Sequence, residues 1–220
     1  MINYAKEKGV YLSVLSDGKF HQTVTKETEG AVLREYETSN GQKGQKWELL
    51  ASSVEGKITN LEIRDGDYGK QLQITMQSGD DTCTISLQTS SNFGEDFMKK
   101  LPSISPDEVI KVAPFAFTDD KGKQRRGITV YRQSGEKVVD HYHKKEGDKI
   151  VAVNGYPAIP ADANGWDSDE WKLYFMNARK FLIEETKKHP LFNQKPVANF
   201  DDFKYPTPAD EGIDPEKITF

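Results

Sequence analysis

The sequence predicts a mainly β protein whose centre is a five-stranded antiparallel barrel. Segments between residues 54 and 142 alternate apolar and polar side chains with a period of two, as half-buried antiparallel strands do. Turns rich in Gly, Asp and Ser separate these segments, and one short amphipathic helix interrupts them. The predicted order is therefore strand, strand, strand, helix, strand, strand.

Turn and periodicity signals place each element of this barrel. The five strands are predicted at residues 56–64, 70–76, 82–87, 109–117 and 127–130. The last of them is expected to continue beyond residue 130. The helix covers 92–101, between the third and fourth strands. This order resembles the OB-fold, which commonly binds oligonucleotides or oligosaccharides on one face and through the loops after strands one and four.

The rest of the chain is expected to extend this barrel. Two predicted hairpins over residues 10–51 extend or cover it, since no linker separates them from it. Asp167 and the acidic residues after it favour the start of a helix over 167–188, with an aromatic stripe that predicts a packing face. We expect one OB-like domain over 1–188 and an extended or disordered acidic tail over 189–220.

Composition and charge limit the classes of protein that the chain can represent. No apolar run approaches the roughly 20 residues that span a bilayer, and the N-terminus lacks the apolar centre of a signal peptide. With a single cysteine, Cys83, we expect a cytoplasmic protein without a membrane association. The net charge is −5, yet residues 121–145 carry eight basic against two acidic side chains, and 201–220 carry six acidic against two basic.

Catalytic motifs are absent from the sequence. It contains no phosphate-binding Gly-rich loop, no Gly-x-Ser-x-Gly elbow and no His-Glu-x-x-His helix. His141 and His143 would share one face of a strand and could ligate a metal, but a solvated strand end explains them as well. We therefore expect a binding protein without a cofactor or metal, and not an enzyme.

Basic and aromatic residues alternate around the fourth and fifth predicted strands. Single-strand binders combine a positive groove with aromatic faces on which bases stack. Phe115 and Phe117 share one face of the fourth strand with Lys111, although that face could instead fill the barrel. The candidate nucleic-acid-binding residues are Tyr68, Lys70, Lys111, Phe115, Phe117, Lys121, Lys123, Arg125, Arg126, Tyr131 and Arg132.

The barrel order, the basic and aromatic strand pair and the acidic tail ending in Phe220 resemble the single-stranded DNA-binding proteins of bacteria and tailed bacteriophages. That resemblance implies non-specific binding of single strands during phage DNA replication, recombination or repair, in the cytoplasm of a bacterial host. It also implies that the tail docks replication or recombination proteins, and that the protein could form a homo-oligomer. The tail residues that the resemblance assigns to this docking are Asp210, Glu211, Asp214, Glu216 and Phe220.

Two other functions fit the same sequence. A virion structural or assembly protein would use the barrel and tail as interaction modules. A carbohydrate-binding barrel would use Trp47, Trp166 or Trp171 as platforms, although Trp171 belongs to the aromatic stripe of the helix.

Overall fold

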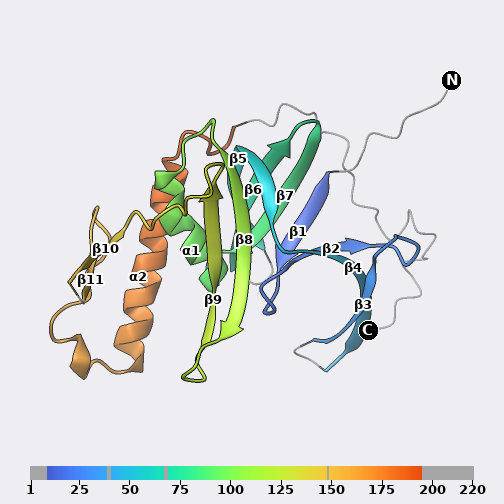
Figure 1. Cartoon of the computed structure of the whole chain (residues 1–220). Coiled ribbons are helices and arrows are strands. Elements are labelled where there is room, and N and C mark those ends of the chain that lie inside the picture. The colour runs from blue at the N-terminus through green and yellow to red at the C-terminus, as the bar shows by residue number, and fades with distance from the viewer. Residues whose placement is uncertain (1–8, 39–40, 67–68, 148, 195–220) are drawn as a thin grey trace, which may run out of the picture.

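Nine strands join one curled, open sheet in the computed structural model, which describes residues 9–38, 41–66, 69–147 and 149–194 (Figure 1). The strands of this sheet are β1 Val10–Val14, β2 Phe20–Val24, β3 Val32–Glu37, β4 Lys43–Ala51, β5 Val54–Gly66, β6 Gly69–Ser78, β7 Asp81–Gln88, β8 Val109–Thr118 and β9 Gln124–Arg132. Their order across the sheet is β3-β4-β2-β1-β7-β6-β5-β8-β9. The protein is therefore mainly β, as predicted.

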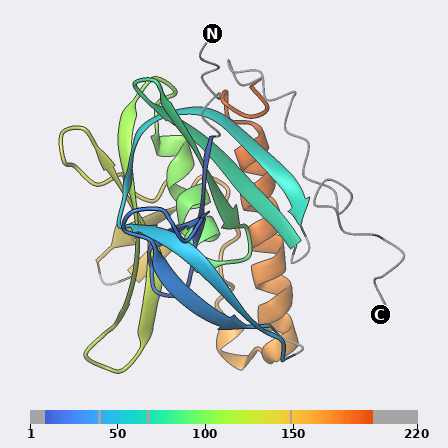
Figure 2. The same ribbon diagram turned by 90° about the vertical axis from the view of Figure 1, so that its right-hand side faces the viewer.

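Helices and a small ribbon complete the described part of the chain. The elements are α1 Asn92–Lys100, α2 Ser168–Lys187, the 3₁₀ turns Leu101–Ser103 and Ala163–Gly165, and a ribbon of β10 His143–Glu146 with β11 Lys149–Ala152. The sheet curls around α1, with α2 beyond it (Figure 2). None of these described helices is long and apolar enough to cross a membrane.

The predicted succession of elements between residues 54 and 142 is confirmed, but the predicted five-stranded barrel is too small. β5, β6 and β7 form an antiparallel meander, α1 follows, and the β8–β9 hairpin attaches where β8 pairs with the start of β5. The sheet does not close between β7 and β9 in the described residues. Instead β1 pairs in parallel with β7, from Val10 opposite Cys83 to Ser13 opposite Ser86, so the N-terminal strands enlarge the sheet.

Alternation along the strands produces one core on the inner face of the curl. Leu72, Ile74 and Met76 of β6 are fully buried, with their polar neighbours on the other face. The buried side chains of α1 that enter the same core are Phe93, Phe97 and Met98. The Ser91 hydroxyl accepts a hydrogen bond from the Gly94 N–H at 3.1 Å and so caps the start of this helix.

Two side chains of α1 satisfy the free backbone edge of β9. The Ile128 N–H donates to Asp96 Oδ2 at 2.7 Å, and Lys100 Nζ donates to the Ile128 carbonyl at 2.6 Å. Pro114, which has no N–H to donate, lies opposite Ile128 on β8, as suits a non-hydrogen-bonded pair in which the Ile128 N–H and carbonyl point to the outer edge. Because buried backbone groups require partners, α1 takes the place that a neighbouring strand would occupy.

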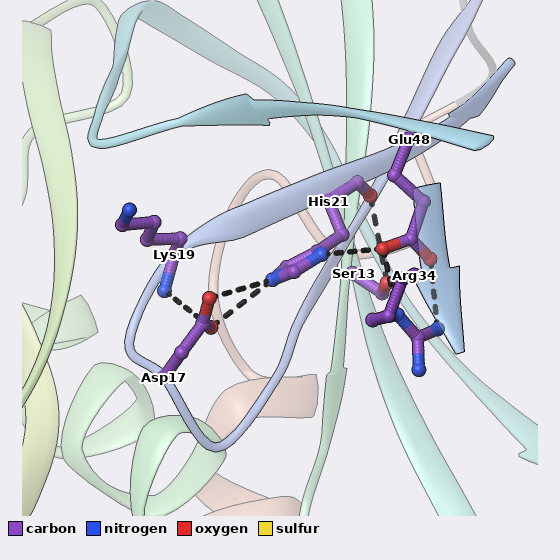
Figure 3. Close-up of polar contacts among 6 residues, drawn as sticks. All are labelled: Ser13, Asp17, Lys19, His21, Arg34 and Glu48. Carbon is purple, nitrogen blue, oxygen red and sulfur yellow. Dashed lines mark hydrogen bonds and ion pairs between the residues drawn. The ribbon is translucent and has the colours of Figure 1, made fainter. Parts of the chain in front are cut away.

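A buried polar network fastens the N-terminal strands to one another (Figure 3). His21 and Glu48 are 5% and 3% exposed, and His21 Nδ1 lies 2.8 Å from Glu48 Oε2. The other ring nitrogen lies 3.0 Å from Asp17 Oδ1, while Arg34 donates two hydrogen bonds of 2.7 Å to Glu48. Each ring nitrogen of His21 thus faces a carboxylate, and the buried Glu48 carboxylate also accepts from the Arg34 guanidinium.

The β1–β2 turn also contacts the far side of the curl. Gly18 has a positive φ of 72° and lies against the backbone of Phe115 and Ala116 in β8, where a Cβ would overlap their atoms. Only glycine combines this conformation with so close an approach. The turn therefore links the N-terminal strands directly to the β8–β9 hairpin.

The segment after α2 pairs with β5 before the described part of the chain ends. Asp167 caps α2 as predicted, since its side chain accepts from the N–H of Asp169 and of Glu170, and the Glu170 side chain accepts from the Asp167 N–H to complete a capping box. Beyond the helix, the Leu61 N–H donates to the Leu191 carbonyl at 2.9 Å, and the Asn193 N–H donates to the Leu61 carbonyl at 2.8 Å. Residues 191–193 of the predicted tail thus lie along β5, and residues 195–220 lie outside the described residues.

We expect Glu48 to make the stability of the protein sensitive to acid. The two hydrogen bonds from Arg34 lower the pKa of Glu48 from 4.5 to about 2. A carboxyl group with a lowered pKa stabilises the fold above pH 4.5, by about 3 kcal/mol, and this contribution is lost as the pH falls toward 2. Glu48→Gln should therefore unfold more easily at pH 7 and lose less stability between pH 5 and pH 2.

Urea denaturation at a series of pH values measures this difference. Glu37→Gln removes an exposed carboxylate from β3 and serves as the matched control. If the free energy of unfolding changed with pH in the same way for the wild type and Glu48→Gln, the acid sensitivity would not come from Glu48.

We also expect Gly127 to be required for the contact between α1 and β9. A Cβ at this position would lie 2.5 Å from Asp96 Oδ2 and 2.9 Å from Phe115 Cζ. Since Asp96 is held by its bond to Ile128, Gly127→Ala should lower the free energy of unfolding by about 1–3 kcal/mol. Gly165→Ala is the control, because an added Cβ there meets no atom within 4 Å. Equal denaturation midpoints for the two variants would show that the contact is dispensable.

Candidate nucleic-acid interface

The outer face of the β8–β9 hairpin brings together five of the predicted site residues. The register places Lys111 opposite Tyr131 and Phe117 opposite Arg125, with Phe115 opposite Gly127 between them. The residues that alternate with these, such as Ile110 and Val112, are fully buried in the core. The predicted phase of both strands is therefore the phase that the structure shows.

Neither phenylalanine of β8 fills the core, although the sequence favoured that interpretation. Phe117 is 56% exposed, and Phe115 is half-buried beside Gly127. Their ring centroids are 5.8 Å apart with an interplanar angle of 35°. β5 pairs with β8 only as far as Val112, so the second half of the hairpin extends past its neighbour on the sheet. This extension leaves aromatic surface available for stacking.

Asp119 shapes the basic tip of the hairpin. Its carboxylate accepts from the backbone N–H of Lys121 at 3.1 Å and of Lys123 at 2.8 Å, and from Arg125 Nε at 2.8 Å. These hydrogen bonds, that of Lys123 foremost, lower the pKa of Asp119. The turn is thereby fixed with the Lys121 and Lys123 side chains exposed, while Arg126 lies across from Ala116 on the other face and donates to Gln124.

Besides Arg126, two of the predicted cations lie away from this face. Arg132 donates to Glu108 and, at 2.9 Å, to the Ser103 carbonyl, so its guanidinium holds the loop after α1. Lys70 pairs with Asp65 at 2.7 Å at the β5–β6 end of the sheet, opposite to the β8–β9 tip because β5 and β8 are antiparallel. The remaining candidates lie outside the described residues: Tyr68, Asp210, Glu211, Asp214, Glu216 and Phe220.

A shallow groove of about 530 Å³ adjoins the outer face at its Lys111 end. Besides Lys111 and Tyr131, its lining includes Ser52, Ser53 and Glu55, which sequence reasoning missed. Glu55 precedes the predicted start of its strand by one residue and carries no local signal of a site. Only the pairing of β5 with β8 brings it to the groove.

Other candidate residues form packing clusters. Trp166 and Trp171 have ring centroids 5.0 Å apart at the start of α2, whereas Trp47 lies on β4 near the other edge of the sheet. His143 Nδ1 lies 2.9 Å from Asp140 Oδ2, and the His141 ring packs edge-on against Tyr142. Within the described residues, no three His, Cys, Asp or Glu side chains are arranged to hold a metal ion.

Comparison with protein-family models, with curated proteins and with solved structures finds no match for the chain. Any function must therefore be inferred from the geometry of the chain itself.

Proposed function

We propose that the protein binds single-stranded DNA and coats it with little sequence preference, in phage DNA replication, recombination or repair. The observation that supports this most strongly is the outer face of the β8–β9 hairpin. There the exposed Phe117 ring lies opposite Arg125 and beside Phe115, with Lys111 further along the same face of β8. Rings of this kind stack with any base, and cations beside them attract the phosphates of any sequence.

The order of β5, β6, β7, α1, β8 and β9 supports an OB-like module for this binding. The proposed module is open on the side where α1 covers the edge of β9, and β1 lies beside β7. OB-folds commonly bind single strands across an outer sheet face and nearby loops, which fits the hairpin and its basic turn. The acidic tail is proposed to dock replication or recombination proteins.

The tip cations should contribute affinity without sequence preference. Replacing Arg125 and Arg126 with Ala should weaken binding of a labelled oligothymidine of about 30 nucleotides at least tenfold. The slope of log affinity against log salt concentration should become shallower by about one to two, since one to two phosphate contacts are lost. Fluorescence anisotropy at several salt concentrations measures both, beside the matching duplex. Lys144→Ala with Lys145→Ala removes the same charge from exposed positions of β10 and is the control. Unchanged affinity in the Arg125 and Arg126 variant would remove the hairpin from the interface.

The exposed ring of Phe117 should contribute through stacking. Phe117→Ala should weaken binding by roughly 1–3 kcal/mol while leaving the salt dependence nearly unchanged, because no phosphate contact is lost. The same titration measures this, and Phe175→Ala on α2, whose ring is 50% exposed, is the control. A loss equal for the two variants would argue against a specific stacking site on β8.

A virion or assembly protein is the second candidate, and exposed apolar residues on α2 favour it. Leu173, Phe175 and Met176 are 54%, 50% and 56% exposed on its N-terminal half. Apolar residues that are exposed together as one contiguous patch mark interaction surfaces. Stable association with structural proteins and no binding of single strands at low salt would support this candidate over the first.

A further inference from the structure

One residue from each of three neighbouring strands forms a row in the groove beside the proposed interface. The register places Glu55 of β5 opposite Lys111 of β8, and Lys111 opposite Tyr131 of β9. Facing residues in a sheet point to the same side, so an anion, a cation and an aromatic ring stand next to one another. All three line the groove of about 530 Å³, together with Ser52 and Ser53.

The dimensions of this row suit one nucleotide. Neighbouring strands lie about 4.8 Å apart, so the backbones of Glu55 and Tyr131 are separated by roughly 10 Å. A base that stacks on the half-buried Tyr131 ring would direct its polar edge across the groove toward Glu55. Lys111, which stands between them on a long flexible side chain, can turn outward to a phosphate.

The two charged residues of the row are available to a ligand. Glu55 and Lys111 are exposed, and neither makes a side-chain hydrogen bond or ion pair of standard geometry with another described residue. An exposed cross-strand pair of this kind contributes little to stability even when it forms. The row therefore has no evident structural role.

We propose that this groove is a nucleobase subsite that selects bases carrying an exocyclic amino group. This proposal rests on the proposed binding of single-stranded DNA. The Glu55 carboxylate has only acceptor atoms, so it pairs with the amino group of cytosine. Thymine presents a carbonyl oxygen at the same position, and two acceptors repel each other. Tyr131 supplies the stacking face and Lys111 the phosphate contact. The protein then coats any single strand, with one subsite that favours cytosine over thymine.

Oligonucleotides of 5-methylcytosine and of thymine test this selection, because both bases carry the 5-methyl group and differ only in the donors and acceptors of the pairing edge. At pH 7.5 and equal length, we expect the wild type to bind the 5-methylcytosine strand about 3- to 10-fold more tightly in an anisotropy titration. In Glu55→Gln the ratio should fall to near one, because an amide both donates and accepts. Glu37→Gln removes the same charge from β3 and should keep the wild-type ratio.

The possible failures are distinguishable. Equal affinity of the wild type for both strands, or an unchanged ratio in Glu55→Gln, would overturn the selective subsite and leave the proposed function intact. Failure to bind either strand at low salt would overturn the proposed function and the subsite with it.

Discussion

The contact between α1 and the edge of β9 determines the architecture of this protein. A nine-stranded sheet has two edges, and at one of them the Asp96 and Lys100 side chains bind the backbone of Ile128, while residues 137–138 pair with the next part of β9. Each side chain satisfies one backbone group of Ile128, and Gly127 provides the space for Asp96 to approach. With this edge contacted by α1 and with β1 paired to β7, the sheet stays open, and α1 packs in the core that it encloses.

On the opposite side of the curl, a network of charged side chains connects the N-terminal strands. β1 lies beside β7, and the network of Asp17, His21, Glu48 and Arg34 joins the β1–β2 turn to β2, β3 and β4 around the buried His21 and Glu48. Buried charges of this kind cost free energy unless each has its partners, and here the partners come from four different segments. The arrangement specifies how these strands meet, and the Gly18 turn extends the same constraint to β8.

Local patterns in the sequence predicted the elements and the phase of the β8–β9 hairpin, since side-chain alternation is a property of each strand alone. They could not predict partners distant in sequence. Asp96 and Lys100 have the four-residue spacing of an ordinary surface ion pair on a helix, and nothing local shows that both reach Ile128. The exposure of Phe117 depends on where β5 stops pairing with β8, which is likewise a tertiary fact. Glu55 was missed for the same reason, because its neighbours in the groove belong to β8 and β9.

The parallel pairing of β1 with β7 separates the order of synthesis from the order of assembly. Residue 10 meets residue 83, whereas the β5–β6–β7 meander is built from neighbours in sequence. Closing so long a loop costs entropy before any contact repays it, so local hairpins are favoured to form first. β1, which leaves the ribosome before the meander does, must therefore wait until the meander exists before it pairs with β7. During that interval the open edge of β7 is the surface on which a nascent chain could pair with the wrong neighbour.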